Sequence, residues 1–150
     1  MAKRLEDLAP QGLIDRAQRA AGLVDSSSRV RLLCHYDPDG TTSASILARA
    51  LLRRGKRVHA TMSHALDKSV ADRVRAETNE LLIVSDMGSG QLDLLESMPF
   101  PVIVLDHHKP LRDTETIVHI NPHLAGVDGA REMCGATTSW LFTMVLDEAN

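Results

Sequence analysis

The stretch that decides the fold is VRLLCHYDPDG, residues 30–40. Its first five residues form a mostly apolar run that predicts a buried strand, and the segment from Thr41 to Arg54 has the apolar spacing of a helix. Two carboxylates, Asp37 and Asp39, therefore lie between a strand and a helix. Open α/β sheets bind their ligands beyond the carboxyl ends of the strands, so this pair of acids predicts a metal site.

Two further strands are expected to end in potential metal ligands. The apolar runs at 81–85 and 101–105 are each followed by such groups, which are Asp86, Asp106, His107 and His108. Carboxylates brought together at one sheet edge would repel one another without cations, and mixed oxygen and imidazole ligands suit manganese or a comparable divalent ion. Two ions about 3.5–4 Å apart would stabilise both the attacking and the leaving oxygen in phosphoester hydrolysis.

The rest of the pattern predicts an α/β fold with a doubly wound, mainly parallel five-stranded sheet and helices on both faces. Leu5 to Val24 has helical spacing, with a break near Pro10, and a polar loop follows. The strands are expected at 30–34, 57–62, 81–85, 102–105 and 117–120, and the later helices at 41–54, 67–78, about 92–95 and 133–146. We expect Thr41, Thr42 or Ser43 to cap the helix after the first strand.

Composition limits the size and the environment of the protein. The 150 residues, 43% hydrophobic and 25% charged, are enough for one domain with a real core. The net charge of −3 neither supports nor excludes nucleic acid, because metal-binding carboxylates themselves make a sequence acidic. Cys34 and Cys134 fall in an apolar and a helical segment, which predicts two buried thiols. Without a long apolar stretch or signal peptide, we expect a cytoplasmic protein that makes no membrane contact.

Five short motifs follow one another along the chain: HYDPDG at 35–40, DMGS at 86–89, DHH at 106–108, INPH at 120–123 and GVDGA at 126–130. In this order the chain resembles the DHH phosphoesterase superfamily, and most of all its archaeal RecJ-like branch, from about Val30 to Phe142. The resemblance implies a manganese- or magnesium-dependent phosphodiesterase. Members are most often exonucleases that degrade single-stranded DNA or RNA from the 5′ end, in DNA repair or replication.

The resemblance also implies a role for each motif residue. The implied metal ligands are Asp37, Asp39, Asp86 and His107, with His35 ranked below them. Asp86 would be shared between two ions, Asp106 would orient the neighbouring imidazoles, and His108 would contact the scissile phosphate or donate a proton. The last helix begins with Gly135, Ala136 and Thr137, whose amides the resemblance places near the substrate phosphate.

Two features depart from the family pattern. Members generally supply one more Asp ligand after the last helix, and this chain offers only Asp147, which we expect on the helix itself. The family's C-terminal substrate-binding domain has no counterpart here. We therefore expect residues 1–150 to form a single DHH domain with a leading helix and loop at 1–28, and the activity of this chain alone is an open question.

Simpler explanations exist for individual residues. Asp-Pro-Asp-Gly at 37–40 is ordinary turn chemistry, and Asp86 alone would be expected to cap a helix. We interpret the four remaining histidines as surface or structural residues: His59, His64, His119 and His123. Lys109 is as easily a solvated side chain as a phosphate contact. The joint occurrence of the motifs nevertheless favours a metal site over independent coincidences.

Three functions remain open from the sequence. The first is a RecJ-like exonuclease that hydrolyses single-stranded DNA or RNA with two metal ions. The second is a catalytically weak or inactive RecJ-like scaffold that binds replication proteins, which the missing Asp favours and the intact ligand set disfavours. The third is a hydrolase of small phosphoesters such as an oligonucleotide or a cyclic dinucleotide. It ranks lower because the pyrophosphatase-like branch spaces the His and Asp of its first motif differently.

Overall fold

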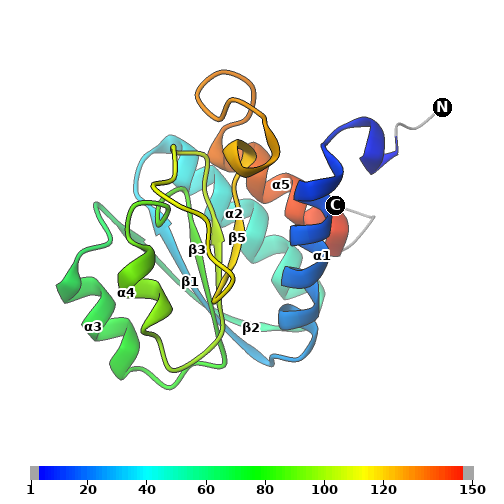
Figure 1. Cartoon of the computed structure of the whole chain (residues 1–150). Helices are drawn as coiled ribbons and strands as arrows, with labels where there is room; N and C mark the ends of the chain where they lie inside the picture. Colours follow the sequence, from blue (N-terminus) through cyan, green and yellow to red (C-terminus); the bar gives the residue numbers. More distant parts are fainter. Residues whose placement is uncertain (1–3, 147–150) are drawn as a thin grey trace.

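The computed structural model describes residues 4–146 and confirms an α/β fold with one five-stranded sheet (Figure 1). The strands are β1 (Arg29–His35), β2 (Arg57–Ser63), β3 (Leu81–Ser85), β4 (Val102–Leu105) and β5 (Val118–Ile120). The helices are α1 (Gln11–Asp25), α2 (Pro38–Arg53), α3 (Lys68–Ala76), α4 (Leu92–Glu96) and α5 (Gly135–Leu146), with 3-10 turns η1 (Leu5–Asp7) and η2 (Pro122–Ala125). Within 4–146, none of the helices combines the length and apolarity that crossing a membrane requires.

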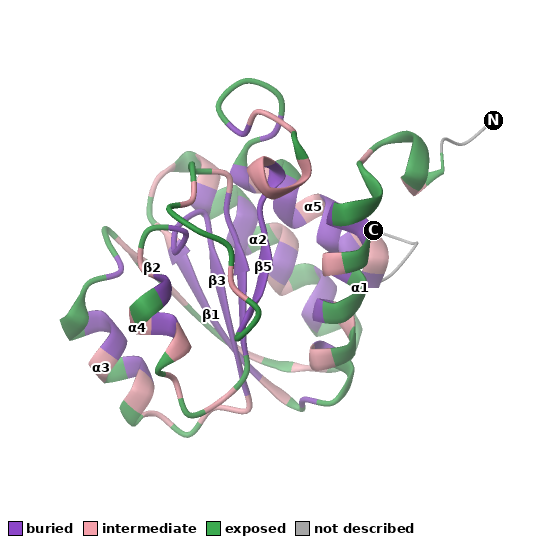
Figure 2. Cartoon of the chain, in the orientation of Figure 1, coloured by how far each residue is buried: buried purple, intermediate pink, exposed green. Residues whose placement is uncertain are grey.

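Helices cover both faces of the sheet, α1, α2 and α5 on one side and α3 and α4 on the other (Figure 1). Successive side chains of a strand point to opposite faces, so β3 contributes Ile83 to the first core and Leu82 to the second. All five residues of β3 are buried (Figure 2), as expected for a central strand of a parallel sheet. The predicted alternation of strand and helix is thus confirmed, and all four strand pairings are parallel.

The order of the strands, β2-β1-β3-β4-β5, creates a switch point between β1 and β3. From β1 the chain passes through α2 outward to β2, and it returns through α3 to β3 on the other side of β1. The loops after β1 and β3 therefore diverge at the carboxyl edge of the sheet. Such a crevice is where open α/β sheets bind ligands.

Helix α2 begins three residues earlier than predicted. Asp37 is its N-cap, with Oδ1 accepting a hydrogen bond from the Gly40 amide at 2.9 Å, and Pro38 occupies the first turn, where no amide hydrogen is needed. The prediction that Thr41, Thr42 or Ser43 caps this helix was therefore wrong. The earlier start places Asp39 on the first turn of α2, with a fixed backbone.

The break in the leading helix and the burial of Cys34 were predicted correctly, and the burial of Cys134 was not. The leading helix is broken as predicted, since Pro10 separates η1 from α1 as the N-cap of α1. Cys34 is buried in β1, and this burial raises the pKa of its thiol to about 12. Cys134, predicted to be buried, is exposed, because α5 begins only at Gly135 and the cysteine lies in the loop before it.

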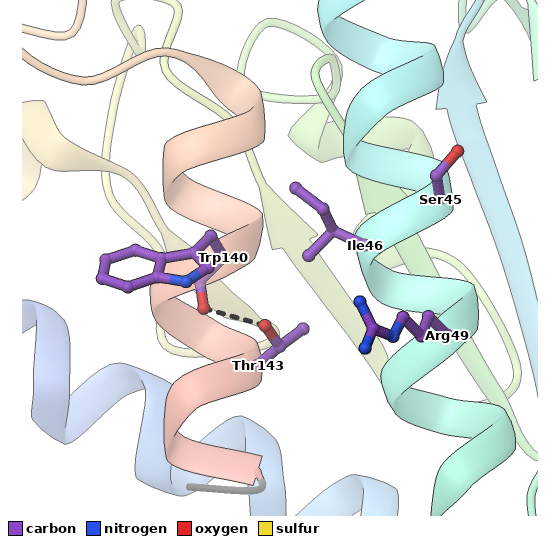
Figure 3. Close-up of a pocket in the computed structure, with 5 residues that line it drawn as sticks. All are labelled: Ser45, Ile46, Arg49, Trp140 and Thr143. Atoms are coloured by element: carbon purple, nitrogen blue, oxygen red, sulfur yellow. Dashed lines mark hydrogen bonds between the residues drawn. The ribbon is translucent and has the colours of Figure 1, made fainter. Parts of the chain in front are cut away.

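A cavity of 230 Å³ lies between α2 and α5, away from the carboxyl edge of the sheet. Ile46 projects from α2 toward α5, and the backbone oxygen of Trp140 accepts a hydrogen bond from the Thr143 hydroxyl (Figure 3). Ser45 and Arg49 complete the lining. The five lining residues include neither a carboxylate nor an imidazole, so this cavity is not a metal site.

Candidate metal centre

Three adjacent strands, β1, β3 and β4, each lead to side chains that can bind a metal, and these side chains meet at the carboxyl edge of the sheet. After β1, Asp37 is the N-cap of α2 and Asp39 lies on the first turn of that helix, and Asp86 directly follows β3. The Asp-His-His motif directly follows β4. All five ligands that the resemblance implied lie in this cluster: His35, Asp37, Asp39, Asp86 and His107. The predicted meeting of the three motifs is therefore found in the tertiary structure.

Asp86 is the central residue of this cluster. Its backbone has φ = 59°, a left-handed value that is uncommon outside glycine and costs conformational energy. The side chain is almost fully buried, and neither carboxylate oxygen has a hydrogen-bond partner among the described residues. Burial raises the pKa of Asp86, and the negative charges of Asp39 and Asp37 raise it further. A buried carboxylate without donors is stabilised by a bound cation, so this residue fits a metal centre.

The ring of His107 is oriented for ligation through Nε2. Nδ1 lies 2.7 Å from the Gly129 carbonyl oxygen, to which it donates, so the neutral form of the ring has its lone pair on Nε2. Nε2 lies 3.3 Å from Oδ1 of Asp86 and 3.5 Å from Oδ2 of Asp39. The Asp86 carboxylate, and after it the Gly129 carbonyl oxygen, raise the pKa of His107 to about 9. A Cβ on Gly129 would lie 2.1 Å from the His107 carbonyl oxygen, so only glycine permits this approach.

Asp39 links the first motif to the start of α5. Its Oδ2 and Oδ1 accept hydrogen bonds from the amides of Gly135 at 2.8 Å and Ala136 at 2.7 Å, where the helix dipole also favours negative charge. A Cβ on Gly135 would lie 2.5 Å from Oδ1 of Asp86, which makes glycine necessary there. In this structure these amides thus bind a carboxylate. Their contact with a substrate phosphate, together with that of the exposed Thr137, stays a prediction.

Asp106 lies beneath the imidazoles, where it is buried. It accepts hydrogen bonds from the amides of Ser89 and His107 at 3.0 and 2.8 Å and from Nδ1 of His108 at 2.7 Å. Burial alone would raise the pKa of Asp106, but the donors, His108 and Ser89 foremost, lower it to about 2. The same bond raises the pKa of His108, whose side chain is 61% exposed. Asp106 thus orients the neighbouring ring, and Nε2 of His108 is left available.

Three buried polar residues below the motif were not assigned a role from the sequence. Nδ2 of Asn121 donates to the His108 carbonyl oxygen at 2.8 Å and to Oγ of Ser89 at 2.9 Å. Oγ of Ser89 lies 2.9 Å from Nε2 of His119. His119 is buried and structural rather than on the surface. Ser89 and Asn121 belong to the DMGS and INPH motifs, whereas the only signal for His119 was that a polar residue occurs in a buried strand.

The ligand atoms form two overlapping groups that could each hold a metal ion. One group is Asp86, His107 and His108, and the other is His35, Asp37 and Asp86, with the ligand atoms of each within 4.8 Å of one another. Asp86 belongs to both groups. This arrangement fits two cations that share one carboxylate. Asp147, considered from the sequence as the remaining ligand, lies outside the described residues.

Comparison with known proteins gives the family. A model described as "DHH family, N-terminal domain" matches residues 29–150, so the chain belongs to the DHH family, within the DHH phosphoesterase superfamily. An uncharacterized protein of Methanocaldococcus jannaschii, MJ0831, is 40% identical over 120 residues, which are 75% of this chain and 28% of that protein. The single-stranded-DNA-specific exonuclease RecJ of Thermus thermophilus is 29% identical over 161 residues, 97% of this chain and 24% of RecJ.

Solved structures agree with this assignment. A crystal structure of exonuclease RecJ bound to manganese superposes with a TM-score of 0.77 at 26% sequence identity, over 99% of this chain and 40% of that one. The motif-based resemblance to the RecJ-like branch is therefore confirmed. The chain spans about a quarter of the length of the curated relatives that it matches.

Proposed function

We propose that the chain is the catalytic domain of a RecJ-like enzyme, a metal-dependent phosphodiesterase that hydrolyses single-stranded DNA or RNA. The observation that carries this proposal is Asp86, a buried carboxylate that has no hydrogen-bond partner within residues 4–146 and belongs to two groups of imidazole and carboxylate ligands. The family membership and the RecJ neighbour bound to manganese support the same conclusion. In this proposal residues 1–150 form a single domain. The enzyme acts in the cytoplasm.

Two ions of Mn²⁺ or Mg²⁺ would be held by His35, Asp37, Asp39, Asp86 and His107. When bound, they supply positive charge for the scissile phosphate and lower the pKa of an attacking water. The protein's own contribution is to fix these ligands before the substrate arrives. Gly129 fixes the tautomer of His107, and the amides of α5 fix both oxygens of Asp39.

His108 is the proposed proton donor of the site. Nδ1 is held by the buried Asp106 carboxylate, which raises the pKa of the ring above its ordinary value and so favours the protonated imidazole. Its side chain is largely exposed beside the ligands and lines a cavity of 350 Å³ with Asp86 and Lys109. From this position His108 binds the phosphate and donates a proton to the leaving oxygen.

The experiment is a cleavage assay with 5′-labelled single-stranded DNA and RNA, in the presence of Mn²⁺, Mg²⁺ or chelator. Wild-type chain is compared with Asp39→Ala and with the control Asp93→Ala, which removes an acid of α4 whose side chain is 93% exposed. We expect metal-dependent cleavage that falls by more than about 100-fold in Asp39→Ala and is unchanged in the control.

Manganese binding, measured by calorimetry, separates the alternatives. An enzyme binds the metal and cleaves, and Asp39→Ala weakens both. A wild-type chain that binds manganese but leaves DNA, RNA and cyclic dinucleotides intact would contradict the proposed activity. That result would favour the RecJ-like scaffold, whose partners would be replication or repair proteins rather than nucleic acid alone.

A further inference from the structure

The chain has a single tyrosine, and it lies inside the metal-binding motif. Tyr36 stands between His35 and Asp37, in a protein of which only 3% of the residues are aromatic. Its side chain is not used to fill the core, because the residue is 52% exposed. An exposed tyrosine is ordinary by itself, so its neighbours decide whether this one has a function.

Two imidazoles hold the ring of Tyr36, one from the end of β1 and one from the loop after β2. The ring of His64, which lies between β2 and α3, packs on it with centroids 3.8 Å apart and planes inclined by 36°. The ring of His35 meets it edge-on, with centroids 5.1 Å apart and planes inclined by 74°. These contacts fix the orientation of the tyrosine and still leave about half of its surface open. The result is an oriented aromatic surface, with little conformational entropy left to lose on binding.

This surface adjoins the metal centre. The cavity of 350 Å³ is lined by His35 and His64, the two rings that contact Tyr36, and also by Asp86, His108 and Lys109. The volume lies in the range of pockets that hold small ligands. The cavity therefore combines metal ligands and cationic side chains suited to a phosphate with the two imidazole rings that contact Tyr36.

We propose that Tyr36, supported by His64, is a stacking platform for a nucleobase adjacent to the scissile phosphate. The inference rests on the proposed phosphodiesterase function and deepens it by specifying the substrate. Every nucleobase can stack on an aromatic side chain, whereas a phosphoester without a base cannot. The site is thus selective for polynucleotides over pyrophosphate or polyphosphate, and it tolerates any base sequence.

The single tyrosine gives a direct test, because ring-labelled tyrosine produces only one set of ring resonances in this chain. The labelled protein, with Mg²⁺, is titrated with two hexanucleotides joined by phosphorothioate linkages, which resist hydrolysis. One is all adenine, and the other has the same backbone and charge but no bases. We expect an upfield ring-current shift of the Tyr36 resonances with the adenine hexamer alone. Equal shifts with both, or no shift with either, would overturn the platform.

Affinities for the same two hexamers, measured by fluorescence anisotropy, give the energetic test. We expect Tyr36→Ala to weaken binding of the adenine hexamer by about 5- to 150-fold, the range of one lost stacking contact, and to leave the abasic hexamer unchanged. Tyr36→Phe keeps the ring and should retain the preference. The control Leu111→Ala removes another exposed apolar side chain, 86% exposed in the loop after β4, and should have no effect.

The outcomes separate this inference from the proposed function. If Tyr36→Ala weakens both hexamers equally, or neither, the platform is refuted even if the wild-type chain cleaves DNA. If the base preference is found and depends on Tyr36 while cleavage is absent, the platform stands and the phosphodiesterase proposal fails. His64→Ala should reduce the preference less than Tyr36→Ala, since it removes the support and leaves the ring.

Discussion

Replacing Asp106 with Asn tests how far one buried carboxylate stabilises the motif loops. Its pKa is lowered from 3.8 to about 2 by donors that outweigh its burial, chiefly His108 and Ser89. At about 1.4 kcal/mol for each pKa unit, the ionised form contributes ~2.4 kcal/mol to the free energy of unfolding. Because the pKa is lower in the folded chain, this contribution is complete above about pH 4 and is lost as the pH falls toward about 2. At about pH 3 the same relation leaves ~1.3 kcal/mol.

The measurement is urea unfolding of metal-free wild type and Asp106→Asn between about pH 5.5 and pH 3, where the imidazole of His108 stays protonated. We expect the variant to be less stable by ~2–3 kcal/mol at the upper pH and the difference to shrink by ~1 kcal/mol at the lower one. The control Asp93→Asn, on an exposed acid, should differ from wild type by no more than about 1 kcal/mol. A difference that does not change with pH would refute the linkage argument.

Three further results are expected. Gly135→Ala should weaken manganese binding by about 10- to 100-fold in calorimetry, because its Cβ would lie 2.5 Å from a ligand oxygen, whereas Gly22→Ala, with nothing within 4 Å, should bind normally. Manganese affinity should rise between pH 7 and about pH 9, because His107 has a pKa of about 9 without metal and must lose its proton to bind. Metal binding should therefore release a proton, and an affinity that does not change with pH would contradict this. Mass spectrometry after iodoacetamide treatment of the native chain should find Cys134 alkylated and the buried Cys34 unmodified, with both modified only in urea.

The sequence by itself determined the elements and the motif residues. Local patterns are enough for this, because a short apolar run bounded by turn residues is typical of a buried strand. The same patterns placed Asp37, Asp86 and Asp106 after three strands, and parallel strands bring their carboxyl ends to one edge. The boundaries were less certain, and the start of α2 was missed because Asp37 itself is the cap.

Only the tertiary structure decided how these residues are held. Asp39 accepts its hydrogen bonds from amides 96 and 97 residues away, and His107 donates to Gly129, which lies 22 residues further on, after β5 and η2. Nothing in a local pattern specifies such pairs, because they depend on the strand order and on the packing of α5 against α2. The support of Tyr36 by His64 likewise required β2 to lie beside β1. The sequence thus supplied the chemical groups of the site, and long-range packing supplied their positions.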